Sequence, residues 1–114
     1  MSWSEIKKAV NSDLSTPLNE QIAEIGFEKY ASANYSYYDA NTTSIIDNIQ
    51  KNGLLFLYPL TNTMLYINGT RLGSSNITSN AMFIMAFSPT DNIVIKGKAG
   101  GYTATGFYSI LTEK

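Results

Sequence analysis

The chain contains no histidine and no cysteine in its 114 residues. Histidine is the usual general base near neutral pH and the commonest metal ligand, whereas cysteine supplies thiolates and disulfides. Their absence excludes Ser-His-Asp and Cys-His catalytic sites and a scaffold held together by disulfides. The carboxylates Asp39, Asp47 and Asp91 are scattered, and isolated aspartates of this kind usually cap turns. We therefore predict that the chain is not an enzyme and has no catalytic residues, no metal site and no cofactor.

Basic residues and long apolar runs are also scarce. The formal net charge is −1, and the only basic pairs are Lys7-Lys8 and Lys96/Lys98. Nucleic-acid binding requires clustered Lys and Arg, so we predict no nucleic-acid partner. The longest apolar run, residues 54–58, is far too short to span a bilayer, and residues 1–5 lack the features of a signal peptide. We expect no membrane insertion and a soluble chain made in the cytoplasm.

The charges that are present gather at one end. Residues 1–29 hold eight of the 17 charged residues, whereas Arg71 and Asp91 are the only two between residues 54 and 95. A short charged segment followed by a nearly charge-free body is typical of a part that is attached at one end and presents or packs a surface at the other. We divide the chain into an N-terminal helical attachment segment, residues 1–26, and a β-sandwich domain, residues 27–114.

The first segment has the pattern of amphipathic helices. Ser2 and Glu5 form a capping box, and Pro17 predicts that the first helix ends near Asp13 or Leu14. A second helix is expected from Pro17 to a stop at Gly26. The apolar residues form one stripe, which we interpret either as a helical pair lying on the body or a neighbour, or as an assembly surface. The stripe consists of Ile6, Val10, Leu14, Leu18, Ile22 and Ile25.

The body has the pattern of short strands separated by turns. Asn68-Gly69 lies between two apolar runs and predicts a two-residue hairpin. Asn52-Gly53 favours a second one, with a short helix over residues 44–50 that ends before Gly53 as the alternative. The run 81–87 is apolar throughout, which indicates a strand buried on both faces or at an interface, and a turn is expected at 88–91. About eight short strands at regular spacing favour an antiparallel β-sandwich or jelly-roll-like body. The predicted fold is mainly β with N-terminal helices.

Tyrosines are the candidate ligand-binding residues. Tyrosine with small polar neighbours makes good recognition surfaces, because rigid rings give contact area at low entropy cost. Tyrosine is also common in strands and at sheet rims, so both interpretations stay open. The candidates are Tyr30, Tyr35, Tyr37, Tyr38 and Tyr102.

Two parts of the sequence resemble known tail proteins. The segments SEIKKAVNSDL at 4–14 and PLN at 17–19 resemble the N-terminus of phage and prophage tail fibre or minor structural proteins of Gram-positive hosts. The segments SIID, KNGL and YING at 44–47, 51–54 and 66–69 are similar to the small β-domains of such proteins. The resemblance brings no catalytic residues. It implies a bacterial protein that forms a homotrimer, contacts other tail proteins and ends in a virion tail or a prophage-derived particle.

Two functions follow from these patterns. The first is a non-enzymatic structural component of a phage or prophage tail, assembling through the N-terminal helices and the β-body. The alternative is a carbohydrate-binding module on the same scaffold, in which the tyrosines stack on sugars of a host-surface glycan. The first depends on self-association, whereas the second requires exposed tyrosine rings.

Overall fold

The structure is a computed structural model, and it describes residues 2–14, 24–38, 42–46, 48–58, 63–77, 82–97 and 103–114. At residues 13, 37, 38, 42, 73–77 and 103–105 only the backbone is described. The elements are α1 Trp3–Asp13, β1 Phe27–Tyr38, β2 Thr42–Ile46, β3 Gly53–Tyr58, β4 Thr63–Ile67, β5 Thr70–Ile77, β6 Phe83–Phe87, β7 Ile93–Gly97 and β8 Thr103–Glu113.

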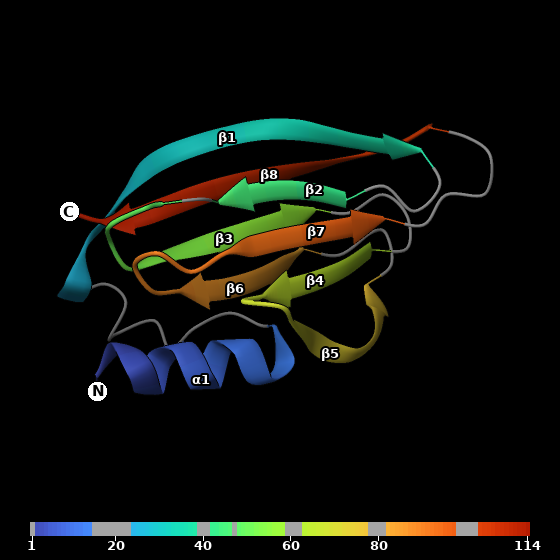
Figure 1. The fold of residues 1–114 in the computed structure, drawn as a ribbon. Coiled ribbons are helices and arrows are strands. Elements are labelled where there is room, and N and C mark those ends of the chain that lie inside the picture. The colour runs from blue at the N-terminus through green and yellow to red at the C-terminus, as the bar shows by residue number, and fades with distance from the viewer. Residues whose placement is uncertain are drawn as a thin grey trace.

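The strands form two antiparallel four-stranded sheets that pack as a sandwich (Figure 1). The first sheet has the order β1-β8-β3-β6 and the second has the order β2-β7-β4-β5. Thus β1 pairs with β8, β2 with β7, β3 with β6 and β4 with β5, as if one long hairpin had been rolled up. This arrangement is that of a jelly roll. The prediction of an antiparallel, jelly-roll-like sandwich preceded by a helix is confirmed.

The tip of the rolled hairpin is the predicted Asn68-Gly69 turn, which is confirmed. Ile67 faces Thr70 across it, and Asn68 and Gly69 have φ values of 50° and 82°. Positive φ at both central positions is the geometry of a type I′ turn, whose twist matches that of the flanking strands.

The hairpin predicted at Asn52-Gly53 is wrong. β2 ends at Ile46 and pairs with β7 in the second sheet, whereas β3 begins at Gly53 in the first sheet. A Cβ atom at position 53 would collide with the ring of Phe87 and the carbonyl oxygen of Leu111. The glycine is therefore required by close packing and not by a turn, and a single sequence does not distinguish these two requirements.

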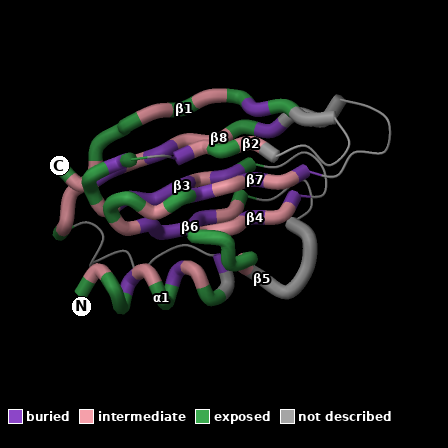
Figure 2. The backbone as a smooth tube through the Cα atoms, in the orientation of Figure 1, coloured by how far each residue is buried: buried purple, intermediate pink, exposed green. Residues whose placement is uncertain are grey.

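The main core lies between the two sheets and is built by alternation along the strands. Leu55 and Leu57 of β3 point into it, as do Ile93 and Ile95 of β7, and all four are fully buried. Figure 2 shows this burial concentrated in the central strands, while β1 is mostly exposed or intermediate. The core is thus supplied by both sheets of one chain.

Helix α1 has the ends that the sequence predicts. The Ser2 hydroxyl accepts from the Glu5 backbone N–H at 3.3 Å, and the Glu5 carboxylate accepts from the Ser2 backbone N–H at 3.2 Å. This backbone hydrogen bond, followed by one from the Ser2 hydroxyl, lowers the pKa of the Glu5 carboxyl. Leu14 adopts a left-handed conformation with φ 56° and ends the helix. Further on, Gly26 with φ 74° follows helical residues 24 and 25.

The first half of the apolar stripe is buried inside the chain. Ile6 and Val10 pack against Leu54 of β3 and against Ile84 and Ala86 of β6, on the outer face of the first sheet. β6 is consequently buried on both faces, by α1 outside and by the core inside. Burial within one chain is therefore enough to explain why this strand carries no charge, and its composition does not support burial between subunits.

Helix α1 also covers the free edge of β6. The Asn11 side chain donates Nδ2–H to the Ala86 carbonyl at 2.9 Å, and its Oδ1 accepts from the Ala86 N–H at 2.8 Å. The Leu14 carbonyl accepts from the Ile84 N–H at 3.1 Å. Asn11 thus takes the place of a neighbouring strand, and backbone groups that would otherwise attract another chain are satisfied.

A polar cluster joins α1 to two turns. Lys7 Nζ lies 2.6 Å from Asp91 Oδ2, which also accepts from the Ser88 backbone N–H at 2.8 Å, and Asp91 Oδ1 accepts from Asn68 Nδ2 at 2.9 Å. Burial alone would raise the pKa of Asp91, but the hydrogen bonds from Lys7, Ser88 and Asn68 outweigh it and lower that pKa. The predicted turn at 88–91 is confirmed by the hydrogen bond from the Asp91 N–H to the Ser88 carbonyl, 3.1 Å.

Candidate functional site

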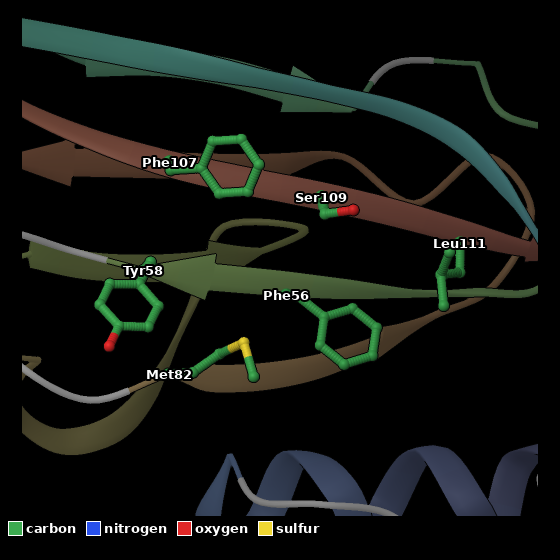
Figure 3. A pocket seen from close by; sticks show the side chains of 6 residues that line it. All are labelled: Phe56, Tyr58, Met82, Phe107, Ser109 and Leu111. Carbon is green, nitrogen blue, oxygen red and sulfur yellow. The ribbon is translucent and has the colours of Figure 1, made fainter.

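An apolar groove lies on the outer face of the first sheet, beside α1. It holds about 320 Å³ and opens between β8, β3 and the residue before β6 (Figure 3). We call it the outer groove. It is lined by Phe56, Tyr58, Met82, Phe107, Ser109 and Leu111.

The register of the first sheet brings these side chains together. Tyr58 of β3 faces Phe107 of β8, and Phe56 faces Ser109 on the same face of the sheet. Their neighbours at alternating positions, such as Leu57, point into the core. These strands are therefore apolar on both faces, and α1 covers only part of the outer one.

The outer groove is exposed and uncharged. Tyr58, Met82 and Phe107 are 44%, 53% and 46% exposed, and with Tyr30 they are the exposed large apolar residues of the described part of the chain. None of the lining residues carries a charge, and the polar groups among them are the hydroxyls of Tyr58 and Ser109. Such a surface can bind an apolar side chain or stack on a flat ring, but it provides no acid–base pair.

The predicted tyrosine surface is only partly present. Tyr35 is 5% exposed and packs over Gly106, where an added Cβ would collide with its ring, so its assignment to a ligand surface is wrong. Its ring lies 6.4 Å from that of Tyr108, centroid to centroid. Tyr30 is 58% exposed, in agreement with a surface role. The side chains of residues 37 and 38 and the whole of residue 102 lie outside the described part.

The predicted assembly stripe is likewise divided. Ile6, Val10 and Leu14 are 3%, 2% and 6% exposed within the chain, so this half is not an assembly surface. The physical reason is that two sheets of this size leave β6 uncovered, and α1 supplies the missing apolar layer. Ile25 is half-buried against the same cluster. Residues 18 and 22 lie outside the described part.

The outer groove is not predicted by the sequence patterns. Phe56, Tyr58 and Phe107 lie in apolar segments that predict strands but no binding surface. One pattern does indicate an apolar outer face. Residues 54–58 are apolar at every position, whereas a strand with one face in solvent needs apolar residues only at alternate positions. How far α1 covers this face is decided by tertiary packing and not by the local pattern.

The described part of the chain holds neither a metal cluster nor a spanning helix. No group of three or more His, Cys, Asp or Glu residues in it is placed to bind a metal ion. No helix within the described ranges is long and apolar enough to cross a membrane.

Neither a known protein family nor a curated protein matches the chain in sequence. Solved structures match it in fold. A predicted oxalate decarboxylase from Thermotoga maritima is 9% identical, with a TM-score of 0.51 over 83% of this chain and 74% of that one. The cupin domain of Cnp3 from Schizosaccharomyces pombe is 12% identical, with a TM-score of 0.50 over 77% and 64%. A Bacillus endospore appendage protein overlaps more weakly, with a TM-score of 0.47 at 12% identity over 77% and 88%.

At these identities the first two structures share the fold with this chain and nothing more. They support a jelly-roll-type sandwich as the architecture. A shared fold does not specify a function, which depends on the surfaces and sites that a chain places on that fold.

Proposed function

We propose that the chain is a non-enzymatic structural component of a phage or prophage tail, in the fibre or near the baseplate. It assembles with copies of itself and with other tail proteins. The resemblance of residues 4–14 and 17–19 to tail proteins supports a location in the tail, and it implies a homotrimer. Residues 3–13 fold onto the sandwich as α1, so most of the first resembling segment is part of the folded unit that assembles.

The outer groove is the observation that carries the assembly part of this proposal. The largest exposed apolar patch of a soluble protein is often a functional surface. Covering the exposed halves of Tyr58, Met82 and Phe107 removes on the order of 250 Å² of apolar surface, a gross gain of about 6 kcal/mol. The lining lacks charge, as the centres of protein interfaces do.

The proposal is tested on particles. Antibodies against the purified chain, applied to particles released after prophage induction in the source bacterium, should label the tail in electron microscopy. Phe107→Asp should reduce incorporation of a tagged copy, because it places a charge in the groove. Ser44→Asp, an exposed serine of β2, is the matched control and should not. Purified particles that lack the chain altogether would reject the proposal.

Carbohydrate binding is the second candidate, favoured by the rings in the groove. Phe107 and Tyr58 are half-exposed neighbours on adjacent strands, and the Ser109 hydroxyl lies beside them. Rings with nearby hydroxyls are suited to stack on and hydrogen-bond a sugar. A glycan array should show binding that Phe107→Ala abolishes and Ser44→Ala preserves. An array at background would reject this candidate and leave the assembly proposal intact.

A further inference from the structure

The edge strands of the two sheets are protected to different degrees. The free edge of β6 is covered by α1, and β5 also contacts α1. β2 has only five residues and is irregular after Ser44. Covering helices, short strands and bulges all blunt an edge against pairing with another chain. β1 differs, because it is 12 residues long and pairs regularly with β8 from Ala31 to Tyr38.

The open part of β1 also lacks protective side chains. Glu28 and Lys29 carry charge at its start, but residues 30–38 contain no charge and no proline. Ser32, Asn34 and Ser36 are exposed on the outer face. Among the described backbone hydrogen bonds outside the strand ladders, none involves residues 30–34 or 36–38. Figure 2 shows this strand as the most exposed long strand of the sandwich.

The sequence of β1 is complementary to itself. Every second residue from 30 to 38 reads Tyr, Ser, Asn, Ser, Tyr, which is the same in both directions around Asn34. When two copies run antiparallel with Asn34 opposite Asn34, Ser32 of one copy faces Ser36 of the other. On the inner face, Ala33 faces Tyr35, a small residue opposite a large one. No like charges meet, so the cross-strand pairs are compatible throughout.

We infer that β1 pairs antiparallel with β1 of a second copy of this chain, around a two-fold axis at Asn34. This inference rests on the self-association in the proposed function, and it assigns a two-fold dimer in place of the homotrimer that the resemblance implies. The first sheets of the two copies join into one eight-stranded sheet. Because the axis is perpendicular to that sheet, both outer grooves open on the same side. The contact closes after two copies.

A cysteine at the two-fold axis gives a direct test, because the chain has no other cysteine. Directly opposed residues of antiparallel strands have Cα atoms about 4.5–5.5 Å apart, and disulfides span roughly 4.4–6.8 Å. Asn34→Cys should therefore form a covalent dimer under mild oxidation at micromolar concentration. Ser32→Cys alone should not, but a mixture of Ser32→Cys with Ser36→Cys should, because these two positions face each other. Ser44→Cys is the exposed control that reports random collision.

A second measurement uses the native protein. Light scattering should give twice the 12.6 kDa mass of one chain at micromolar concentration. Asn34→Lys places two ammonium groups opposite each other and should raise the dissociation constant about tenfold or more, whereas Ser44→Lys should leave it unchanged. Circular dichroism should show that both variants keep the fold.

The inference is overturned by a monomer at every concentration tested, by a trimer, or by cross-linking of Asn34→Cys no faster than that of Ser44→Cys. A trimer would reject the β1 pairing and still agree with the proposed tail assembly. Incorporation into particles without β1 cross-linking would also reject the pairing and agree with the tail assembly. Efficient cross-linking of a chain that is absent from particles would support the pairing and reject the tail.

Discussion

Replacing Asn11 with alanine is expected to destabilise the fold by about 2 kcal/mol, because it leaves backbone groups at the edge of β6 without hydrogen-bond partners. The Asn11 amide satisfies both the N–H and the C=O of Ala86, at 2.8 and 2.9 Å. Ala86 itself is fully buried, so water has poor access to these groups once the amide is removed.

The magnitude follows from two opposing effects. Two buried backbone groups left without partners cost about 1.5 kcal/mol each, or about 3 kcal/mol together. Alanine is a better helix former than asparagine and returns about 0.6 kcal/mol, because Asn11 lies within α1. The net loss of about 2 kcal/mol is large for a domain whose total stability is about 5–15 kcal/mol. It corresponds to a fall of about 1 M in the urea midpoint.

Urea unfolding followed by circular dichroism measures this loss, and hydrogen exchange at the Ala86 amide locates it. Ser12→Ala is the matched control, because Ser12 is exposed on the same helix. This substitution should slightly raise the stability of the protein, since alanine is the better helix former. If Asn11→Ala behaves like Ser12→Ala, or if the Ala86 amide stays as protected as before, then the edge is not held by this side chain.

Three further predictions concern turns and packing. Asp91→Ala should cost about 2 kcal/mol at neutral pH, because it removes the carboxylate that accepts hydrogen bonds from Lys7, Ser88 and Asn68. The pKa of Asp91 is lowered in the folded state, so its contribution is present above the ordinary pKa of aspartate and is lost as the pH falls through the lowered value. The urea midpoints of the wild type and of Asp91→Ala should therefore converge as the pH is lowered from neutral to acid. Thr90→Gly should stabilise by about 0.5 kcal/mol in thermal unfolding, because Thr90 has φ 66°, which strains a β-branched residue; an unchanged midpoint would show that the strain is absent. Gly53→Ala should destabilise by about 3 kcal/mol or more, because the new methyl group meets the Phe87 ring, and near wild-type stability would contradict that packing.

The features predictable from sequence were those set by neighbouring residues. The Ser2 and Glu5 capping box acts within one helical turn, and the Asn68-Gly69 turn needs only two residues with positive φ. In both cases the residue types satisfy the local backbone directly. Regular spacing of turns and apolar runs was then enough to predict a sandwich of about eight strands.

The features that could not be predicted depend on residues far apart in sequence. Gly53 signals a turn or a close approach, and only the position of Phe87 decides between them. Tyr35 is buried because Gly106, some 70 residues later, leaves room for its ring. The outer groove exists because α1 is too short to cover the whole face of the first sheet. No local pattern contains this information.

The unequal edges of the first sheet also determine how far an assembly through β1 can grow. A sheet that is open at both edges can add strands without limit, which leads to fibres. Here α1 closes the β6 edge with a side chain that imitates a strand, and only β1 remains open. Pairing of β1 with its symmetry mate uses the open edge of both copies, so the joined sheet ends at α1 on either side. The same contacts of the helix therefore complete the core of one chain and, for the proposed β1 pairing, limit the assembly to two copies.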